Sequence, residues 1–120
     1  MSKQNIVHIE LPAQNSQESA KFYETLFGWK ITHDEAMNYT MWEPAEGPAG
    51  GFTPIGEEVK PGDILLYIDS QDIDADLKRI EEQGGTIVSP KTEIPTVGWF
   101  GVFKDPAGNT LALYTGMNPG

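Results

Sequence analysis

A histidine and a glutamate near the N-terminus are the residues of this chain best suited to acid–base chemistry. His8 and Glu10 stand two residues apart in the run Ile6–Leu11, where apolar and polar residues alternate as they do in a β-strand. Side chains two apart on a strand share a face and lie about 6–7 Å apart along it. Histidine exchanges its proton near neutral pH. We therefore predict His8 and Glu10 as catalytic or ligand-orienting residues; the alternative is a buried histidine satisfied by hydrogen bonds.

Aromatic side chains from several predicted strands could line a site for a small molecule. Their flat faces bind planar or apolar ligands by stacking and by burying area, and a methionine adds an adaptable surface. Because side chains alternate between the two faces of a strand, some of these aromatics must pack in the core instead. The predicted ligand-binding residues are Tyr39, Met41, Trp42, Tyr67, Trp99 and Tyr114.

The elements that must position these residues occur twice along the chain. In each half, an apolar run leads to a helical pattern, and three short strand-like runs follow. A repeat of this length means two copies of one supersecondary unit. The first predicted strands of the halves are Ile6–Leu11 and Asp63–Ile68, and the later ones are Trp29–Thr32, Tyr39–Glu43, Gly51–Ile55, Thr86–Ser89, Trp99–Lys104 and Thr110–Thr115.

Capping residues mark both predicted helices. Asn15 and Asp72 are suited to cap the first turn of a helix, and Gly28 can end the first helix in a left-handed conformation. In the first helix, an apolar face at helical spacing is predicted to cover the sheet. That face consists of Ala20, Tyr23, Leu26 and Phe27.

We predict an α+β fold with two tandem βαβββ modules. They would form a single domain over residues 1–120, an open, curved, eight-stranded mixed sheet around a cavity. Module one spans about residues 5–55, the link about 56–62 and module two about 63–116. If the helix covers Val7, Ile9 and Leu11 of the first strand, His8 and Glu10 face the cavity.

Charge and composition exclude several classes of protein. The 120 residues carry a formal net charge of −10, which repels nucleic-acid phosphates, so no nucleic-acid partner is expected. No run approaches the ~18 apolar residues of a membrane span, so no membrane partner is expected. The absence of cysteine excludes disulfides and Cys-ligated metals and fits a reducing compartment. With no apolar signal-peptide stretch at its start, the protein is predicted to be cytoplasmic.

The doubled plan and two local motifs resemble the vicinal oxygen chelate superfamily, which includes glyoxalase I, extradiol dioxygenases, fosfomycin-resistance proteins and bleomycin-resistance proteins. The motifs are the helix end Phe22-Tyr23-x-x-Leu26-Phe27-Gly28-Trp29 and the turn Asp105-Pro106-Ala107-Gly108-Asn109. The resemblance covers nearly the whole chain. It implies the sheet described above and a homodimer, because superfamily members usually pair modules across a dimer.

Metal-dependent members of that superfamily place ligands on the first, fourth, fifth and eighth strands. The resemblance puts these positions at His8, at Gly51 or Phe52, near Asp63, and at Ala112. A stable site usually needs at least three protein ligands. We therefore predict no metal ligands and no cofactor, with a divalent ion on an unorthodox set around His8, Glu10 and Asp63 as the alternative.

The resulting prediction is a small-molecule-binding protein of the glyoxalase/bleomycin-resistance type without the usual divalent metal site. Its partners would be a small organic ligand and a second copy of the chain. Whether it is an enzyme stays open; if it is, the resemblance implies a glyoxalase- or dioxygenase-like lyase or oxidoreductase. One alternative is a metal-dependent lyase, isomerase or dioxygenase with non-standard ligands. The other is a non-catalytic interaction module with a vestigial cavity.

Overall fold

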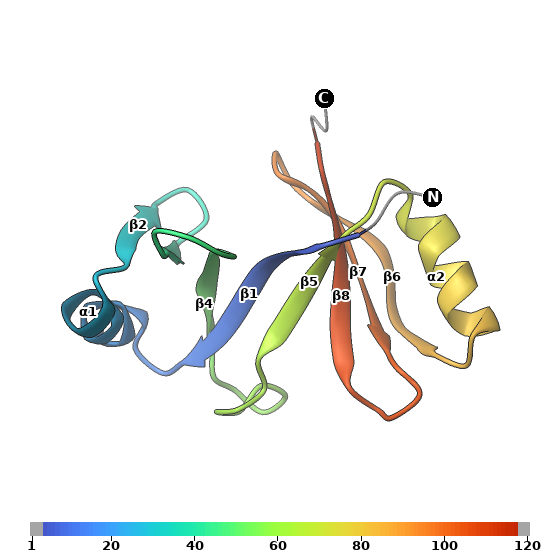
Figure 1. The fold of residues 1–120 in the computed structure, drawn as a ribbon, viewed down its shortest axis with the longest axis horizontal. Helices are drawn as coiled ribbons and strands as arrows, with labels where there is room; N and C mark the ends of the chain where they lie inside the picture. Colours follow the sequence, from blue (N-terminus) through green and yellow to red (C-terminus); the bar gives the residue numbers. More distant parts are fainter. Residues whose placement is uncertain (1–3, 118–120) are drawn as a thin grey trace. The chain divides into compact units, whose positions relative to one another are not determined.

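The computed structural model describes residues 4–117, which form eight strands and two helices in the order βαβββ, βαβββ (Figure 1). The predicted α+β fold with eight mixed strands is confirmed. The elements are β1 (Ile6–Ala13), α1 (Ser16–Phe27), β2 (Lys30–Asp34), β3 (Tyr39–Glu43), β4 (Gly50–Pro54), β5 (Leu65–Asp69), α2 (Ile73–Glu82), β6 (Thr86–Ile94), β7 (Gly98–Lys104) and β8 (Thr110–Gly116).

The chain divides into two compact units. The first unit is Val7–Leu65, and the second unit joins residues 4–6 to residues 66–117. Residues 4–6 therefore belong with the second unit, where the amide of Asp69 donates to the carbonyl oxygen of Asn5 at 2.8 Å.

The first unit packs four strands, in the order β2-β3-β4-β1, against α1. β1 and β4 run parallel, whereas β2–β3 and β3–β4 are antiparallel. The ring of Trp29 stacks on those of Trp42 and Tyr23, with distances between ring centroids of 4.6 and 4.9 Å. Aromatic packing therefore dominates this core. The core residues are Ala13, Ala20, Trp42 and Phe52, with Ile9, Leu11, Tyr23, Trp29 and Ile31 at its margin.

Both ends of α1 follow the sequence prediction. The Asn15 side chain accepts hydrogen bonds from the amides of Gln17 and Glu18, both at 3.1 Å. Gly28 ends the helix with φ 71°, a left-handed conformation that a glycine adopts without a Cβ clash.

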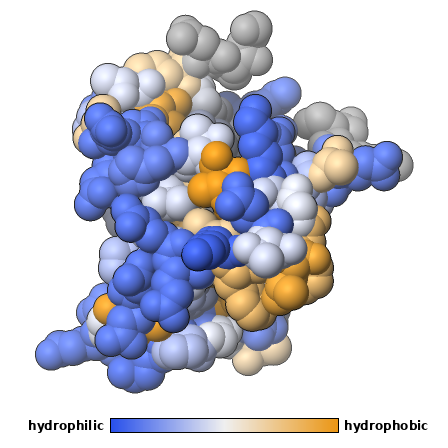
Figure 2. Space-filling model, turned by 90° about the vertical axis from the view of Figure 1, so that its left-hand side faces the viewer, coloured by the Kyte–Doolittle hydropathy of each residue, from blue (hydrophilic) through white to orange (hydrophobic). Residues whose placement is uncertain are grey.

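The predicted apolar face of α1 is only partly correct. Ala20 is buried and Tyr23 packs against the core, but Leu26 and Phe27 are 57% and 61% exposed. Phe22, one helical turn before Leu26, is 55% exposed. In Figure 2, most of the side on which α1 lies is hydrophilic, with the largest hydrophobic area at the lower right and smaller ones elsewhere.

The second unit repeats the plan with the strand order β5-β8-β7-β6 and α2 as its helix. β5 and β8 are parallel, and the other two pairs are antiparallel. Its buried core consists of Ile73, Leu77, Phe103 and Leu113. Neither helix of the described residues has the length and apolarity needed to cross a membrane.

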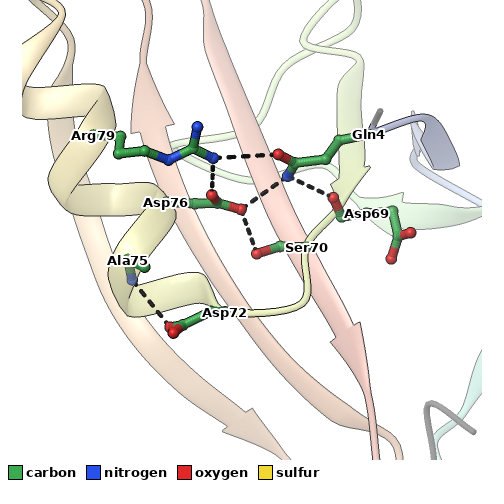
Figure 3. A network of polar contacts seen from close by, with 7 residues as sticks. All are labelled: Gln4, Asp69, Ser70, Asp72, Ala75, Asp76 and Arg79. Carbon is green, nitrogen blue, oxygen red and sulfur yellow. Dashed lines mark hydrogen bonds and ion pairs between the residues drawn. The ribbon is translucent and has the colours of Figure 1, made fainter. Parts of the chain in front are cut away.

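A polar network joins Gln4, just before β1, to the start of α2 (Figure 3). The buried carboxylate of Asp76 accepts from Ser70 Oγ at 2.6 Å, from Gln4 Nε2 at 2.8 Å and from the Arg79 guanidinium. Asp72 caps the helix by accepting from the amide of Ala75 at 3.0 Å. Burial alone would raise the pKa of Asp76, but the hydrogen bonds from Ser70, Arg79 and Gln4 outweigh it and lower the pKa.

Candidate functional site

Strand alternation gives the sheet of the first unit two distinct faces. Ile9 and Leu11 of β1 pack against the core beneath α1, so His8 and Glu10 point to the opposite face, as predicted. Glu10 on β1 and Met41 on β3 are both in register with Gly51 of β4. The face opposite α1 therefore brings residues of three strands together around Gly51.

The hydroxyl of Tyr39 connects His8 to Glu10 on this face. It lies 2.7 Å from His8 Nε2 and donates to Glu10 Oε2 at 2.9 Å. A hydroxyl has one hydrogen, and a carboxylate can only accept. The network therefore assigns the hydrogen of the first contact to His8 Nε2, which donates to the Tyr39 oxygen. We call these three residues the His8–Tyr39–Glu10 cluster.

Gly51 makes room for the ring of Tyr39. A Cβ atom added at Gly51 would lie 2.0 Å from Tyr39 Oη and 2.1 Å from Tyr39 Cζ. Such distances lie far inside van der Waals contact, so no other residue fits there while the ring keeps its place. The phenol thus fills the space into which a side chain at position 51 would point.

The environment of His8 favours its neutral form. Burial of the imidazole lowers the pKa of His8 below its usual 6.5, and the nearby Glu10 carboxylate offsets part of that effect. A neutral imidazole can accept a proton at neutral pH. The cluster therefore combines a neutral imidazole that can accept a proton, a phenol and a carboxylate.

Of the two other predicted contacts in this unit, only Met41 lies on the same face. Met41 follows Tyr39 by two residues on β3, whereas Trp42 points to the α1 side, is 4% exposed and belongs to the core. The Trp42 indole donates to the carbonyl oxygen of Gly51 at 3.0 Å. Strand alternation requires some of the aromatic side chains to pack in the core, and Trp42 is one of them.

In the second unit, two of the three predicted contact residues lie on the face opposite α2. Ile68 and Leu113 pack against the core beneath α2, so Tyr67 and Tyr114 point the other way. The register of β5 and β8 sets Tyr67 beside Ala112.

The third predicted contact residue of this unit, Trp99, lies on the α2 side of the sheet. Its ring packs against the core beneath α2 and lies 5.2 Å from Lys91 Nζ. Phe100, in register with Tyr114, takes the opposite face, although the predicted set does not include it. Side chains alternate along β7, so Trp99 lies on the same face as the core residue Phe103. The same alternation puts Phe100 on the other face.

The side chains present do not fit the metal site of the superfamily. Among residues 4–117, no group of three His, Asp or Glu side chains could hold a metal ion. Phe52 is buried beneath α1, and Gly51 and Ala112 carry no ligand atom. The Asp63 side chain accepts from the amide of Lys60 at 2.9 Å, which makes it part of a turn before β5.

Comparisons with known sequences identify relatives along most of the chain. A glyoxylase-like domain-containing protein from Didymella fabae is 31% identical over 115 residues, which cover 89% of this chain and 90% of the relative. The anthracycline biosynthesis protein DnrV from Streptomyces peucetius is 28% identical over 122 residues. That match covers 88% of this chain but only 44% of DnrV.

Solved structures share the fold at low sequence identity. A methylmalonyl-CoA epimerase from Mycobacterium tuberculosis superposes with a TM-score of 0.71 at 14% identity, covering 94% of this chain and 88% of the epimerase. At that identity the likeness concerns the fold alone. Residues 5–113 match the family model described as the Glyoxalase/Bleomycin resistance protein/Dioxygenase superfamily. The chain therefore belongs to the Glyoxalase/Bleomycin resistance protein/Dioxygenase superfamily.

Proposed function

We propose that this protein binds a small organic molecule on the face of the first unit that carries the His8–Tyr39–Glu10 cluster. The observation behind this proposal is the Tyr39 hydroxyl, bonded to His8 at 2.7 Å and to Glu10 at 2.9 Å. Small-molecule sites combine a few convergent polar groups with apolar surface, and Met41 supplies adaptable apolar surface on the same face.

The charge of the first unit favours a neutral or cationic ligand with a hydrogen-bond donor. Val7–Leu65 contains ten Asp and Glu residues against three Lys and no Arg. The hydrogens of His8 Nε2 and of the Tyr39 hydroxyl are both donated within the cluster. The Glu10 carboxylate, in contrast, can accept more than one hydrogen bond. An anionic ligand would meet a repulsive field, whereas an N–H or O–H group would meet an acceptor.

A ligand screen with matched variants tests this proposal. We would screen neutral, cationic and anionic small molecules by thermal shift and then measure affinities by isothermal titration. Because a hydrogen bond to a charged group contributes about 1.5–3 kcal/mol, we expect Glu10→Gln and Tyr39→Phe to weaken the best neutral or cationic ligands about tenfold or more. His33→Gln is the control, because His33 lies on β2 of the same unit and bonds Thr40 instead. Anionic ligands whose affinity is unchanged by Glu10→Gln would contradict the proposal.

A second candidate function is proton transfer on the bound molecule, with His8 as the base and Glu10 and Tyr39 as its orienting partners. The lowered pKa of His8 supports it, because the imidazole is neutral where a base is needed. For any ligand of the screen with a C–H beside a carbonyl, NMR in D₂O would follow deuterium uptake at that carbon. We expect uptake with the wild type and His33→Gln but not with His8→Gln. Equal uptake with all three proteins would leave only the binding function.

We also propose that the protein works in the cytoplasm as a homodimer. The absence of cysteine among its 120 residues supports a reducing location. Exposed apolar side chains of the first unit, such as Phe22 and Leu26, support an association that covers apolar surface. A tagged chain that fractionated outside the cytoplasm in its own cells would contradict the location.

A further inference from the structure

The close approach of the Tyr39 ring to Gly51 indicates how the His8–Tyr39–Glu10 cluster is built. Glu10 and Gly51 are neighbours in the parallel register of β1 and β4. A Cβ at Gly51 would point at the Tyr39 hydroxyl, which touches both His8 and Glu10. Side chains from positions 8, 10 and 51 therefore converge on one point, and the Tyr39 phenol occupies it.

We infer that Tyr39 and Gly51 form a coupled pair, in which the phenol of Tyr39 occupies the space that a side chain at position 51 would take. By filling this space, the phenol keeps a metal ion from binding to His8 and Glu10, which we call the latent site. With Tyr39 present, the polar centre is a hydrogen-bonded phenol. Without Tyr39, and with a ligating side chain at position 51, the same point has three donor groups. Three protein ligands are the number that a stable divalent site usually needs.

The coupling is tested first through stability. Gly51→Ala must displace the Tyr39 ring and break the bonds at 2.7 and 2.9 Å, and we expect the melting temperature to fall by about 10 °C. Tyr39→Ala in the same chain should then cost far less stability than it does alone, because the hydrogen bonds of the ring are already broken and removing the ring relieves the clash. Tyr39→Phe should not relieve the clash, because the ring carbon Cζ would still lie 2.1 Å from the added Cβ.

A matched control separates the clash from the general effect of replacing glycine. Gly56 lies in the same unit, and a Cβ added there meets nothing within 4 Å, so Gly56→Ala should leave the melting temperature unchanged. Coupled sites show non-additive effects on stability. Simple additivity of Gly51→Ala and Tyr39→Ala, in folded variants, would overturn the pairing of these residues.

The latent site is tested with Ni²⁺ alone, measured by isothermal titration on untagged protein. The double variant Tyr39→Ala/Gly51→His should bind Ni²⁺ at least about tenfold more tightly than Tyr39→Ala, because a third ligand joins His8 and Glu10. Adding His8→Gln to the double variant should remove that gain. A double variant that is folded by circular dichroism and gains no affinity would show that the three positions do not converge. None of these measurements needs an organic ligand, so their failure is distinct from failure of the proposed function.

Discussion

At the residue scale, the partly buried imidazole of His8 makes the stability of the protein depend on pH. Folding lowers the pKa of His8 below 6.5, chiefly because burial disfavours the charged form. Between the folded-state pKa and 6.5, the unfolded chain binds more protons than the folded one. The free energy of unfolding is therefore highest above about pH 6.5 with respect to this group, and it falls as the pH drops toward the folded-state pKa.

Unfolding in urea at pH values from about 5 to 8 measures this effect in the range where histidines titrate. We expect the loss of stability below about pH 6.5 to become smaller in His8→Gln and to persist in His33→Gln, since His33 lies outside the cluster and bonds Thr40. Identical pH profiles for the wild type and His8→Gln would show that the imidazole of His8 is not buried as described.

The sequence could predict which way His8 and Glu10 point but not what they touch. Their direction follows from the apolar partners Ile9 and Leu11, because alternation within one strand is a local property. The bridge from Tyr39 depends on how β1, β3 and β4 align. That register is set by packing between strands, and the two residues opposite Gly51 are far apart in the chain.

At the element scale, the start of α2 depends on the buried carboxylate of Asp76. Replacing it by asparagine would weaken the contacts with Arg79, Ser70 and Gln4 (Figure 3). Loss of hydrogen bonds to a buried charge costs about 1–3 kcal/mol, so we expect Asp76→Asn to lower the free energy of unfolding at pH 7 by that amount. Asp74→Asn, an exposed change in the first turn of the same helix, is the control.

Asp76 also makes the stability depend on pH, but for a different reason from His8. Hydrogen bonds in the folded state favour the charged form of Asp76, whereas burial disfavours the charged form of His8. Because folding lowers the pKa of Asp76 below its usual 3.8, its stabilising effect is present above about that pH and is lost as the pH falls through the folded-state pKa. The stability difference between wild type and Asp76→Asn should therefore shrink in acid. A difference that stays constant down to strongly acidic pH would mean that Asp76 acts through shape and not through charge.

Element boundaries show where local signals stop being sufficient. The strand starting at Thr86 continues to Ile94, well past the predicted Ser89, and its pairing with β7 shifts register between Ile87 and Ser89 and again between Ser89 and Thr92. The second irregularity spans Pro90, which has no amide hydrogen for the ladder. A proline of this kind normally ends a strand prediction, whereas here the strand continues beyond the irregularity.

At the scale of the whole molecule, the internal repeat made the fold predictable, but the limits of the units were not visible in it. The βαβββ pattern rests on apolar periodicity and on caps such as Asn15 and Asp72, all of them local signals. Residues 4–6 join the second unit partly because Gln4 bonds Asp76, 72 positions away. Such a contact leaves no trace in the spacing of the sequence.

The predicted homodimer should become tighter as salt is added. Each copy carries a net charge of −10, so two copies repel each other at low ionic strength, and salt screens that repulsion. We expect apolar side chains to drive the association, such as Phe22, Leu26 and Phe27, which are all more than half exposed. Apolar association does not depend on attraction between charges, so salt does not weaken it. Light scattering after size exclusion should give twice the 13.2 kDa chain mass, and analytical ultracentrifugation should give a dissociation constant that falls with added NaCl. A single-chain mass at every concentration would contradict the dimer, and a dissociation constant that rises with salt would mean that ion pairs hold it together.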